Sequence, residues 1–266
     1  MSDFQARGPA SIHRLRQSLG EREQAIIGSV ERFRYMSSTQ IELLHFTDEA
    51  TSVTAARKCR RLLERLSRTG LIWRLDRRIG GVRAGSASFV YGLGALGYRI
   101  LHDGVPPRQH EPSPQFLDHT LAIAQLAVDL SVAAREDSME LLELVTEPSC
   151  WRAFSAGLEG NQTLKPDLSI VLRSGGYDYH WFVEVDLASH SATSVVRKCA
   201  VYQKYWQTGI EQDKTGVFPR VLWLTPYSRR EALIRRSISA SRQLNSELFD
   251  VCTFETAISR LKGGDL

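Results

Sequence analysis

The sequence has no apolar run approaching the roughly 18 residues that a membrane-spanning helix needs, so we expect no membrane span. No apolar segment follows the start at Met1, so no secretory signal is predicted. Cysteine is scarce, and no two cysteines are spaced as a Cys-x-x-Cys motif. The four cysteines lie far apart in apolar or helical contexts, which predicts reduced core thiols and a cytoplasmic location; they are Cys59, Cys150, Cys199 and Cys252.

Positive charge is concentrated in the first half of the chain. Residues 1–117 carry 18 Lys and Arg against 11 Asp and Glu, whereas residues 118–266 carry 16 against 19. The net charges are therefore +7 and −3, within a chain of 266 residues that is long enough for two small domains. A basic front half attached to a slightly acidic back half suggests a module that binds a polyanion.

Helical spacing of apolar residues predicts an N-terminal domain over residues 21–102. Helices are expected from Glu21, after an N-cap at Ser37 or Ser38, and from beyond Thr54 to about Thr69, with Gly70 as the residue after the helix. A strand at 71–75, a glycine-rich turn, a returning strand at 88–91 and a helix at 93–101 follow. Three helices and a hairpin in this order predict a winged helix-turn-helix. Residues 1–20 are expected to be an irregular tail.

A second domain is predicted over residues 116–266, after a linker at 103–115 that contains four prolines. The expected elements are a helix at 118–135, a strand at 139–146, two strands around a Ser174-Gly175-Gly176 turn, a helix at 192–208 and a strand at 220–225. A helix at 229–245, a strand at 249–254 and a helix at 255–262 complete the pattern. The fold class is therefore mixed α/β, with an α-β-β-β-α-β order and a sheet of four or five strands.

Ten basic residues lie between positions 57 and 83, and only Glu64 and Asp76 oppose them. Four of them recur at spacings of four, four and three and so share one helix face; these are Arg57, Arg61, Arg65 and Arg68. Three more lie at the presumed wing tip, namely Arg77, Arg78 and Arg83. Such a face suits neutralisation of phosphates and recognition of guanine edges in double-stranded DNA; the alternative is a solvated charged surface. The candidate DNA-binding residues are Arg57, Lys58, Arg60, Arg61, Arg65, Arg68, Arg77, Arg78 and Arg83, with Arg74 the tenth basic residue.

Carboxylates stand at the ends of two adjacent predicted strands. Asp167 opens the apolar run 168–172, and the run 180–183 leads into Glu184-Val185-Asp186. Buried carboxylates are costly unless a cation pairs with them. A hairpin would bring these three acids together, and oxygen ligands of this kind suit Mg²⁺ or Mn²⁺.

Pro166-Asp167, sixteen residues and then Glu184-Val185-Asp186 resembles the PD-(D/E)xK core of restriction-endonuclease-like enzymes. This resemblance implies a metal ion bound by Asp167, Glu184 and the Val185 carbonyl. Asp186 stands where that superfamily usually has its lysine. Some members carry the lysine on the following helix, where this chain has Arg197 and Lys198. We therefore list Asp167, Glu184, Asp186 and Lys198 as candidate catalytic residues, with Glu143 or Glu147 as a further ligand and His180 or His190 as weaker candidates.

The chain as a whole resembles the replication-relaxation family of plasmids and integrated elements. The segments that carry the resemblance are Thr54–Leu71, Gly85–Leu93, Lys165–Asp167, Phe182–Asp186 and Lys198-x-x-x-Tyr202. The resemblance implies a DNA-binding protein of a plasmid or mobile element that acts in replication, DNA relaxation or conjugative mobilisation. Its implied partners are double-stranded DNA and other plasmid replication or mobilisation proteins, with a homodimer left open.

Two functions remain open at this level. One is a Mg²⁺- or Mn²⁺-dependent DNA nickase or nuclease. The other is a non-catalytic DNA-binding regulator, or an accessory protein of a DNA-relaxing complex, in which the nuclease-like fold has lost its chemistry. A further Gly92-x-Gly94-x-x-Gly97 motif lacks a βαβ unit and is interpreted as a helix entry and not as a dinucleotide site.

Overall fold

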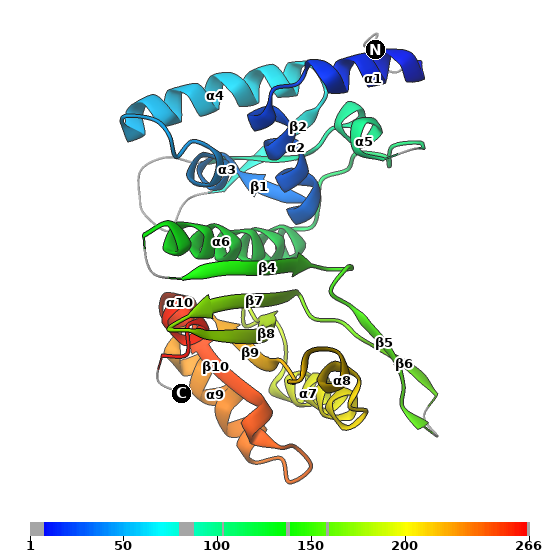
Figure 1. Ribbon diagram of the computed structural model, residues 1–266, viewed down its shortest axis with the longest axis vertical. Coiled ribbons are helices and arrows are strands. Elements are labelled where there is room, and N and C mark those ends of the chain that lie inside the picture. The colour runs from blue at the N-terminus through cyan, green and yellow to red at the C-terminus, as the bar shows by residue number, and fades with distance from the viewer. Residues whose placement is uncertain (1–7, 80–87, 103, 137–138, 158–159, 265–266) are drawn as a thin grey trace. The chain divides into compact units, whose positions relative to one another are not determined.

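The computed structural model describes residues 8–79, 88–102, 104–136, 139–157 and 160–264, without the side chains of residues 9, 10 and 77–79. It confirms the mixed α/β class (Figure 1). The chain divides into two compact units, Met1–Val128 and Asp129–Leu266. The boundary between the units falls inside helix α6, Pro114–Glu136. The glycine-rich turn and Arg83 lie outside the described residues.

The first unit consists of helices around a small antiparallel sheet. Its elements are α1 (Pro9–Ser18), α2 (Glu21–Phe33), β1 (Tyr35–Ser37), α3 (Ser38–His45), α4 (Ser52–Arg68), β2 (Ile72–Ile79), β3 (Ser88–Leu93), α5 (Ala95–Leu101) and the first part of α6. The strands have the order β1-β3-β2, and β3 pairs antiparallel with both neighbours. The expectation that residues 1–20 form an irregular tail was wrong for Pro9–Ser18. This polar segment forms helix α1, which contacts α5. The short β1 was also not predicted.

Side chains and one glycine set the ends of the helices in this unit. Ser37 begins α3 with a capping box: its hydroxyl accepts from the Gln40 amide at 3.2 Å, and its amide donates to the Gln40 side chain at 2.9 Å. Thr51 caps α4 by accepting from the Thr54 amide at 3.2 Å. Gly70 follows α4 with φ of +75°, which confirms the predicted glycine after the helix.

The helix entry at the glycine motif requires glycine for close packing. Gly94 is the N-cap of α5, and a Cβ atom there would lie 2.1 Å from the Gly70 carbonyl oxygen. A Cβ atom at Gly97 would lie 2.1 Å from the Leu71 carbonyl oxygen. The motif therefore lets α5 approach the turn between α4 and β2, in agreement with the interpretation as a helix entry.

The second unit has a five-stranded mixed sheet, as predicted, in the order β10-β9-β8-β7-β4. The antiparallel strands are β4 (Glu140–Thr146), β7 (Leu168–Ser174) and β8 (Tyr177–Val185), and β8 then pairs parallel with β9 (Arg220–Thr225), which pairs parallel with β10 (Phe249–Thr253). The connecting helices are α7 (Ala192–Gln207), α8 (Ile210–Thr215) and α9 (Ser228–Ser239), and α10 (Ala257–Leu261) closes the unit. The 3₁₀ turns are Ser246–Leu248 and Phe254–Thr256.

One face of this sheet packs against α7 and α9. Phe182 of β8 and Trp223 of β9 share a buried cluster with Cys199 and Tyr202 of α7 and Ile234 of α9. Alternation along β8 therefore places residues 182 and 184 on the helix-covered face. All four cysteines are buried and unpaired, as predicted, and burial raises the pKa of each thiol to about 12.

Three features of this unit were not predicted. A hairpin of β5 (Arg152–Ser155) and β6 (Asn161–Leu164) precedes β7, and it is anchored by Phe154, whose ring lies 5.1 Å from that of Tyr205. Helix α8 follows α7 and supplies Glu211, which accepts from Arg152 at 2.7 Å. Helix α9 ends at Ser239 instead of residue 245.

Helix α6 alone, among the described residues, is long and apolar enough to cross a membrane, although its apolar runs are short and are interrupted by polar residues. Half of its most apolar stretch is buried inside the protein, including Ala124, Val128 and Leu130. The core helix of a soluble protein has the same properties, so this is weak evidence for a membrane span.

Candidate functional site

Helix α4 separates its apolar and charged residues sharply. Ala55, Cys59, Leu63 and Leu66 are buried on one side. Because successive helical residues are rotated by about 100°, the opposite side of α4 is formed by a row of four exposed residues. We call this row the outer stripe; it consists of Arg57, Arg61, Glu64 and Arg68.

Cations on the flanks of α4 are engaged by acids of neighbouring elements. Lys58 lies 2.5 Å from a Glu49 oxygen, and Arg65 lies 2.7 Å from a Glu23 oxygen. Arg60 donates to the Ala56 carbonyl at 3.2 Å. The residues of the outer stripe, in contrast, make no hydrogen bond or ion pair within the part of the chain that the structure describes. Their charged groups are therefore the ones available to a partner.

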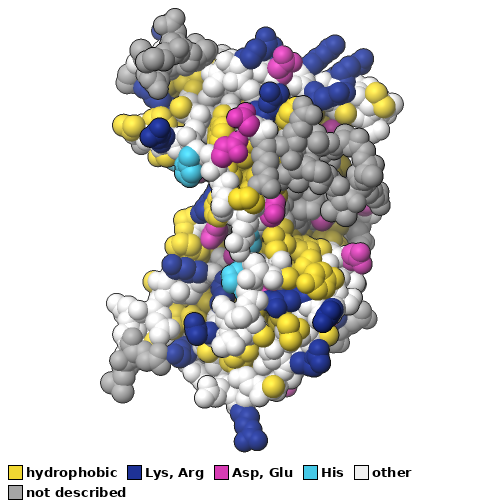
Figure 2. All heavy atoms as spheres, turned by 180° about the vertical axis from the view of Figure 1, so that it is seen from behind, with side chains coloured by type: hydrophobic (Ala, Val, Ile, Leu, Met, Phe, Trp, Pro, Cys, Tyr) yellow, Lys and Arg dark blue, Asp and Glu magenta, His cyan; other side chains and the backbone are white. Residues whose placement is uncertain are grey.

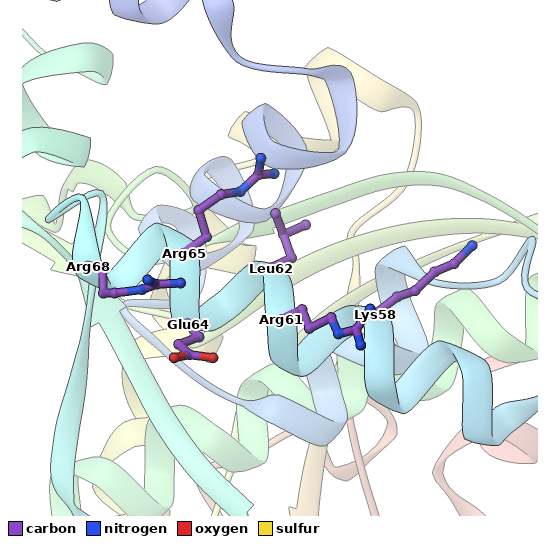
Figure 3. Close-up of a pocket in the computed structure, with 6 residues that line it drawn as sticks. All are labelled: Lys58, Arg61, Leu62, Glu64, Arg65 and Arg68. Carbon is purple, nitrogen blue, oxygen red and sulfur yellow. The ribbon is translucent and has the colours of Figure 1, made fainter.

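A hollow of about 440 Å³ follows the exposed side of α4. Figure 3 shows Leu62 and Arg65 projecting from one side of the helix and Glu64 from the other. In Figure 2, Lys and Arg side chains gather on the end of the first unit where Figure 1 places α4. The described residues that line the hollow are Lys58, Arg61, Leu62, Glu64, Arg65 and Arg68.

Strand β2 carries three of the remaining basic residues, Arg74, Arg77 and Arg78. Arg74 stacks on the Phe89 ring, with its guanidinium carbon 4.4 Å from the ring centroid. Arg77 and Arg78 belong to β2, but their side chains are outside the described part, and so is Arg83.

The structure brings Asp167 and the end of β8 together. Asp167 immediately precedes β7 and is 7% exposed. Its amide donates to the Val183 carbonyl at 3.1 Å, and its Oδ2 accepts from the Val185 amide at 2.7 Å. The amide and carbonyl of one strand residue point to the same edge, so the Val185 carbonyl faces the Asp167 side of β8.

Glu184 is buried and held by two residues of α7. The ammonium of Lys198 donates to one carboxylate oxygen, and the Tyr202 hydroxyl donates to the other at 2.5 Å. Burial raises the pKa of Glu184 to about 8; Lys198 opposes this shift, and the neighbouring Asp167 adds to it. Burial would lower the pKa of Lys198, but the charges of Glu184 and Asp167 outweigh it and raise that pKa.

Asp186 has a different partner, although it shares the helix-covered face with Glu184. It is 0% exposed, and its Oδ2 lies 2.6 Å from the Arg230 guanidinium of α9. Its Oδ1 accepts from the Ala188 amide at 2.5 Å, and Arg230 also donates to the His190 carbonyl at 2.6 Å. Asp186 therefore fixes the chain after β8 against α9.

The other predicted residues are distributed unevenly. Lys198 reaches Glu184, whereas Arg197 is exposed one position earlier. Glu147 lies near the cluster, since its amide donates to the Asp167 carbonyl at 3.2 Å and its charge acts on Lys198. Glu143 is exposed on β4, and His180 pairs with Val171 within the sheet. Within the described ranges, no group of three His, Cys, Asp or Glu side chains has the arrangement of a metal site.

Sequence reasoning did not assign a role to Arg230. Its sequence context, a pair of arginines at the start of α9, is indistinguishable from an exposed basic patch. Tyr202 was noted only as part of the family resemblance, and its spacing of four from Lys198 was the available signal, because both face one side of a helix.

A family model described as replication-relaxation matches residues 27–221. The chain belongs to the replication-relaxation family. The match covers α4, Asp167, Glu184 and Lys198, and it links the protein to replication or relaxation of a mobile element. No curated protein and no solved structure matches the chain.

Proposed function

We propose that this replication-relaxation protein binds duplex DNA through the outer stripe of α4. The observation that carries the proposal is the division of charge on α4: acids from other elements engage Lys58 and Arg65, while Arg57, Arg61 and Arg68 remain available. Arginines on one exposed helix face are suited to contact phosphates and guanine edges.

The order of elements supports the same proposal. Helices α2, α3 and α4 follow one another, with β1 between the first two and the β2–β3 hairpin after the third, and this order agrees with that of a winged helix. In helix-turn-helix proteins the second helix of the motif enters the major groove, and α4 holds that position here. The buried free cysteines favour a reducing, cytoplasmic setting for this activity.

Salt-dependent binding tests this proposal. A labelled duplex is titrated with wild-type protein and with the Arg57→Ala/Arg61→Ala variant between about 50 and 200 mM salt. Loss of two phosphate contacts lowers the slope of log K against log salt by about one to two. A matched control, Arg16→Ala/Arg32→Ala, removes two charges from α1 and α2. An unchanged slope in the α4 variant refutes the assignment of α4.

Metal-dependent nicking or cleavage of DNA is the second candidate function. It is favoured by the meeting of Asp167, Glu184 and Lys198 on adjacent strands and the following helix. The order α6-β4-β7-β8-α7-β9 around them, with the β5–β6 hairpin inserted, agrees with a restriction-endonuclease-like unit.

The donor groups fit a hard divalent ion. Each oxygen of the Glu184 carboxylate accepts one hydrogen bond, from Lys198 or from Tyr202. A carboxylate has about four lone-pair sites in total, so sites on both oxygens are left for a metal ion. Asp167 and the Val185 carbonyl would complete an all-oxygen set for Mg²⁺ or Mn²⁺. Such an ion would supply Lewis-acid activation of water and of the phosphate. Lys198 would then balance the charge of the phosphate while Tyr202 holds the Glu184 carboxylate in place.

Supercoiled plasmid tests this second function. The protein is incubated with the plasmid and Mg²⁺, Mn²⁺ or EDTA, beside Glu184→Ala and the exposed control Glu143→Ala. Open-circular or linear product that requires the metal and Glu184, but not Glu143, would support a nuclease. Binding without product would support a non-catalytic DNA-binding protein, the alternative that the family membership also allows.

A further inference from the structure

The outer stripe of α4 contains one acid among its cations. Resting on the proposed binding of duplex DNA by α4, we infer that Glu64 reads a base, and that it accepts a hydrogen bond from the N4 amino group of a cytosine in the major groove. This inference deepens the proposed function, because it makes a G·C pair part of the site that the protein prefers.

A partner that binds the outer stripe of α4 also contacts Glu64. On a wheel of about 100° per residue, Glu64 lies close to opposite the buried row of Ala55, Cys59, Leu63 and Leu66. Arg61 and Arg68, three positions before and four positions after it, are its nearest neighbours on the stripe. Any duplex that meets these arginines therefore also meets the Glu64 carboxylate.

Glu64 is also not neutralised by any of the residues that the structure describes. The neighbouring acids Glu49 and Glu23, in contrast, each pair with a cation of α4, Lys58 and Arg65. Arg60, Arg61 and Arg68 lie three or four positions from Glu64, where helical ion pairs form. None of them makes an ion pair with it among the described residues, and Arg60 donates instead to the Ala56 carbonyl. Glu64 is exposed and has no hydrogen bond within the same part of the chain.

Electrostatics decides what such a carboxylate can contact. A DNA phosphate repels the Glu64 carboxylate, so Glu64 does not contact the phosphate backbone of the DNA. In the major groove the hydrogen-bond donors are the amino groups of cytosine and adenine, and adenine carries the acceptor N7 beside its amino group. A carboxylate therefore suits cytosine, while glutamine suits adenine. Arg61 and Arg68, one turn before and after Glu64, are placed to contact neighbouring guanines.

Selection from a pool of duplexes with a randomised centre tests the inference. Wild-type protein, Glu64→Gln and the exposed control Glu21→Gln are each used to retain duplexes, and the retained pools are sequenced. Glutamine has a helix propensity close to that of glutamate, so the variant keeps α4. We expect wild type and the control to favour cytosine at one position by about tenfold, and Glu64→Gln to lose that preference and accept adenine there.

The outcomes separate the inference from the function on which it rests. If Glu64→Gln keeps the wild-type preference and binds every duplex more tightly by one factor, Glu64 only repels phosphates and the inference is overturned. Retention by the wild type without any base preference also overturns it, while the proposed DNA binding stands. If the wild type retains no duplex at all, the proposed function fails and the inference fails with it.

Discussion

The buried carboxyl of Glu184 is expected to make the second unit less stable as the pH rises. Its pKa is raised to about 8 in the folded protein from an ordinary value of 4.5, so the folded state holds a proton that the unfolded state releases. The free energy of unfolding therefore falls between pH 4.5 and about 8. Outside this pH range, the contribution of Glu184 to the unfolding free energy does not change with pH. The pKa difference corresponds to a fall of about 5 kcal/mol at most.

Glu184→Gln removes this titration and keeps the shape of the side chain. We expect its unfolding free energy to change much less than that of the wild type between pH 5 and 8. Urea unfolding followed by tryptophan fluorescence measures this, because four of the five tryptophans lie in the second unit, at positions 151, 181, 206 and 223. Glu143→Gln, on an exposed position of β4, is the matched control.

Two results would refute this reasoning. A wild-type unfolding free energy that rises from pH 5 to 8 would mean that groups other than Glu184 dominate. A Glu184→Gln variant with the wild-type slope would mean that Glu184 is ionised in the folded state throughout, held so by Lys198.

Two further predictions concern packing and charge. Arg230→Met leaves Asp186, which is 0% exposed, without its cation, and we expect a loss of about 3–5 kcal/mol in unfolding free energy, whereas the exposed neighbour in Arg229→Met changes little. Gly97→Ala places a Cβ atom 2.1 Å from a backbone oxygen and is expected to cost about 1–3 kcal/mol or more in a thermal melt. Gly28→Ala, which meets no atom within 4 Å in α2, is its control and is expected to stabilise by up to about 1 kcal/mol. Equal melting temperatures for the two glycine variants would contradict the packing argument.

Strong periodicity made the larger elements predictable. The apolar residues of α2 and α4 recur at helical spacing, and the runs of β7, β8 and β9 are continuous because both faces of the central strands are buried. The Gly175–Gly176 turn has positive φ at both residues, as a two-residue hairpin turn of type I′ requires. Helix α1 and the β5–β6 hairpin escaped prediction because their sequences are polar, and tertiary contacts such as that between Phe154 and Tyr205 determine their structure.

The acidic cluster was predictable only in part. Spacing alone places Glu184 and Asp186 on the same side of a strand. Which helix supplies the cation to each depends on how α7 and α9 pack on the sheet, and no local pattern contains that information. In the structure Lys198 pairs with Glu184 and Arg230 pairs with Asp186, so Asp167 and Glu184 stay together while Asp186 is held apart by α9.

The position of the unit boundary inside α6 has a practical consequence for dividing the protein. Leu117 and Leu121 of α6 pack with Leu75 and Val90, so they complete the core of the first unit. Gln40 also donates to the Leu121 carbonyl at 2.9 Å. A fragment that ends in the proline-containing segment before α6 would leave this core open to water. A stable fragment for isolated DNA-binding experiments must therefore extend into α6, even though limited proteolysis would favour the exposed segment before it.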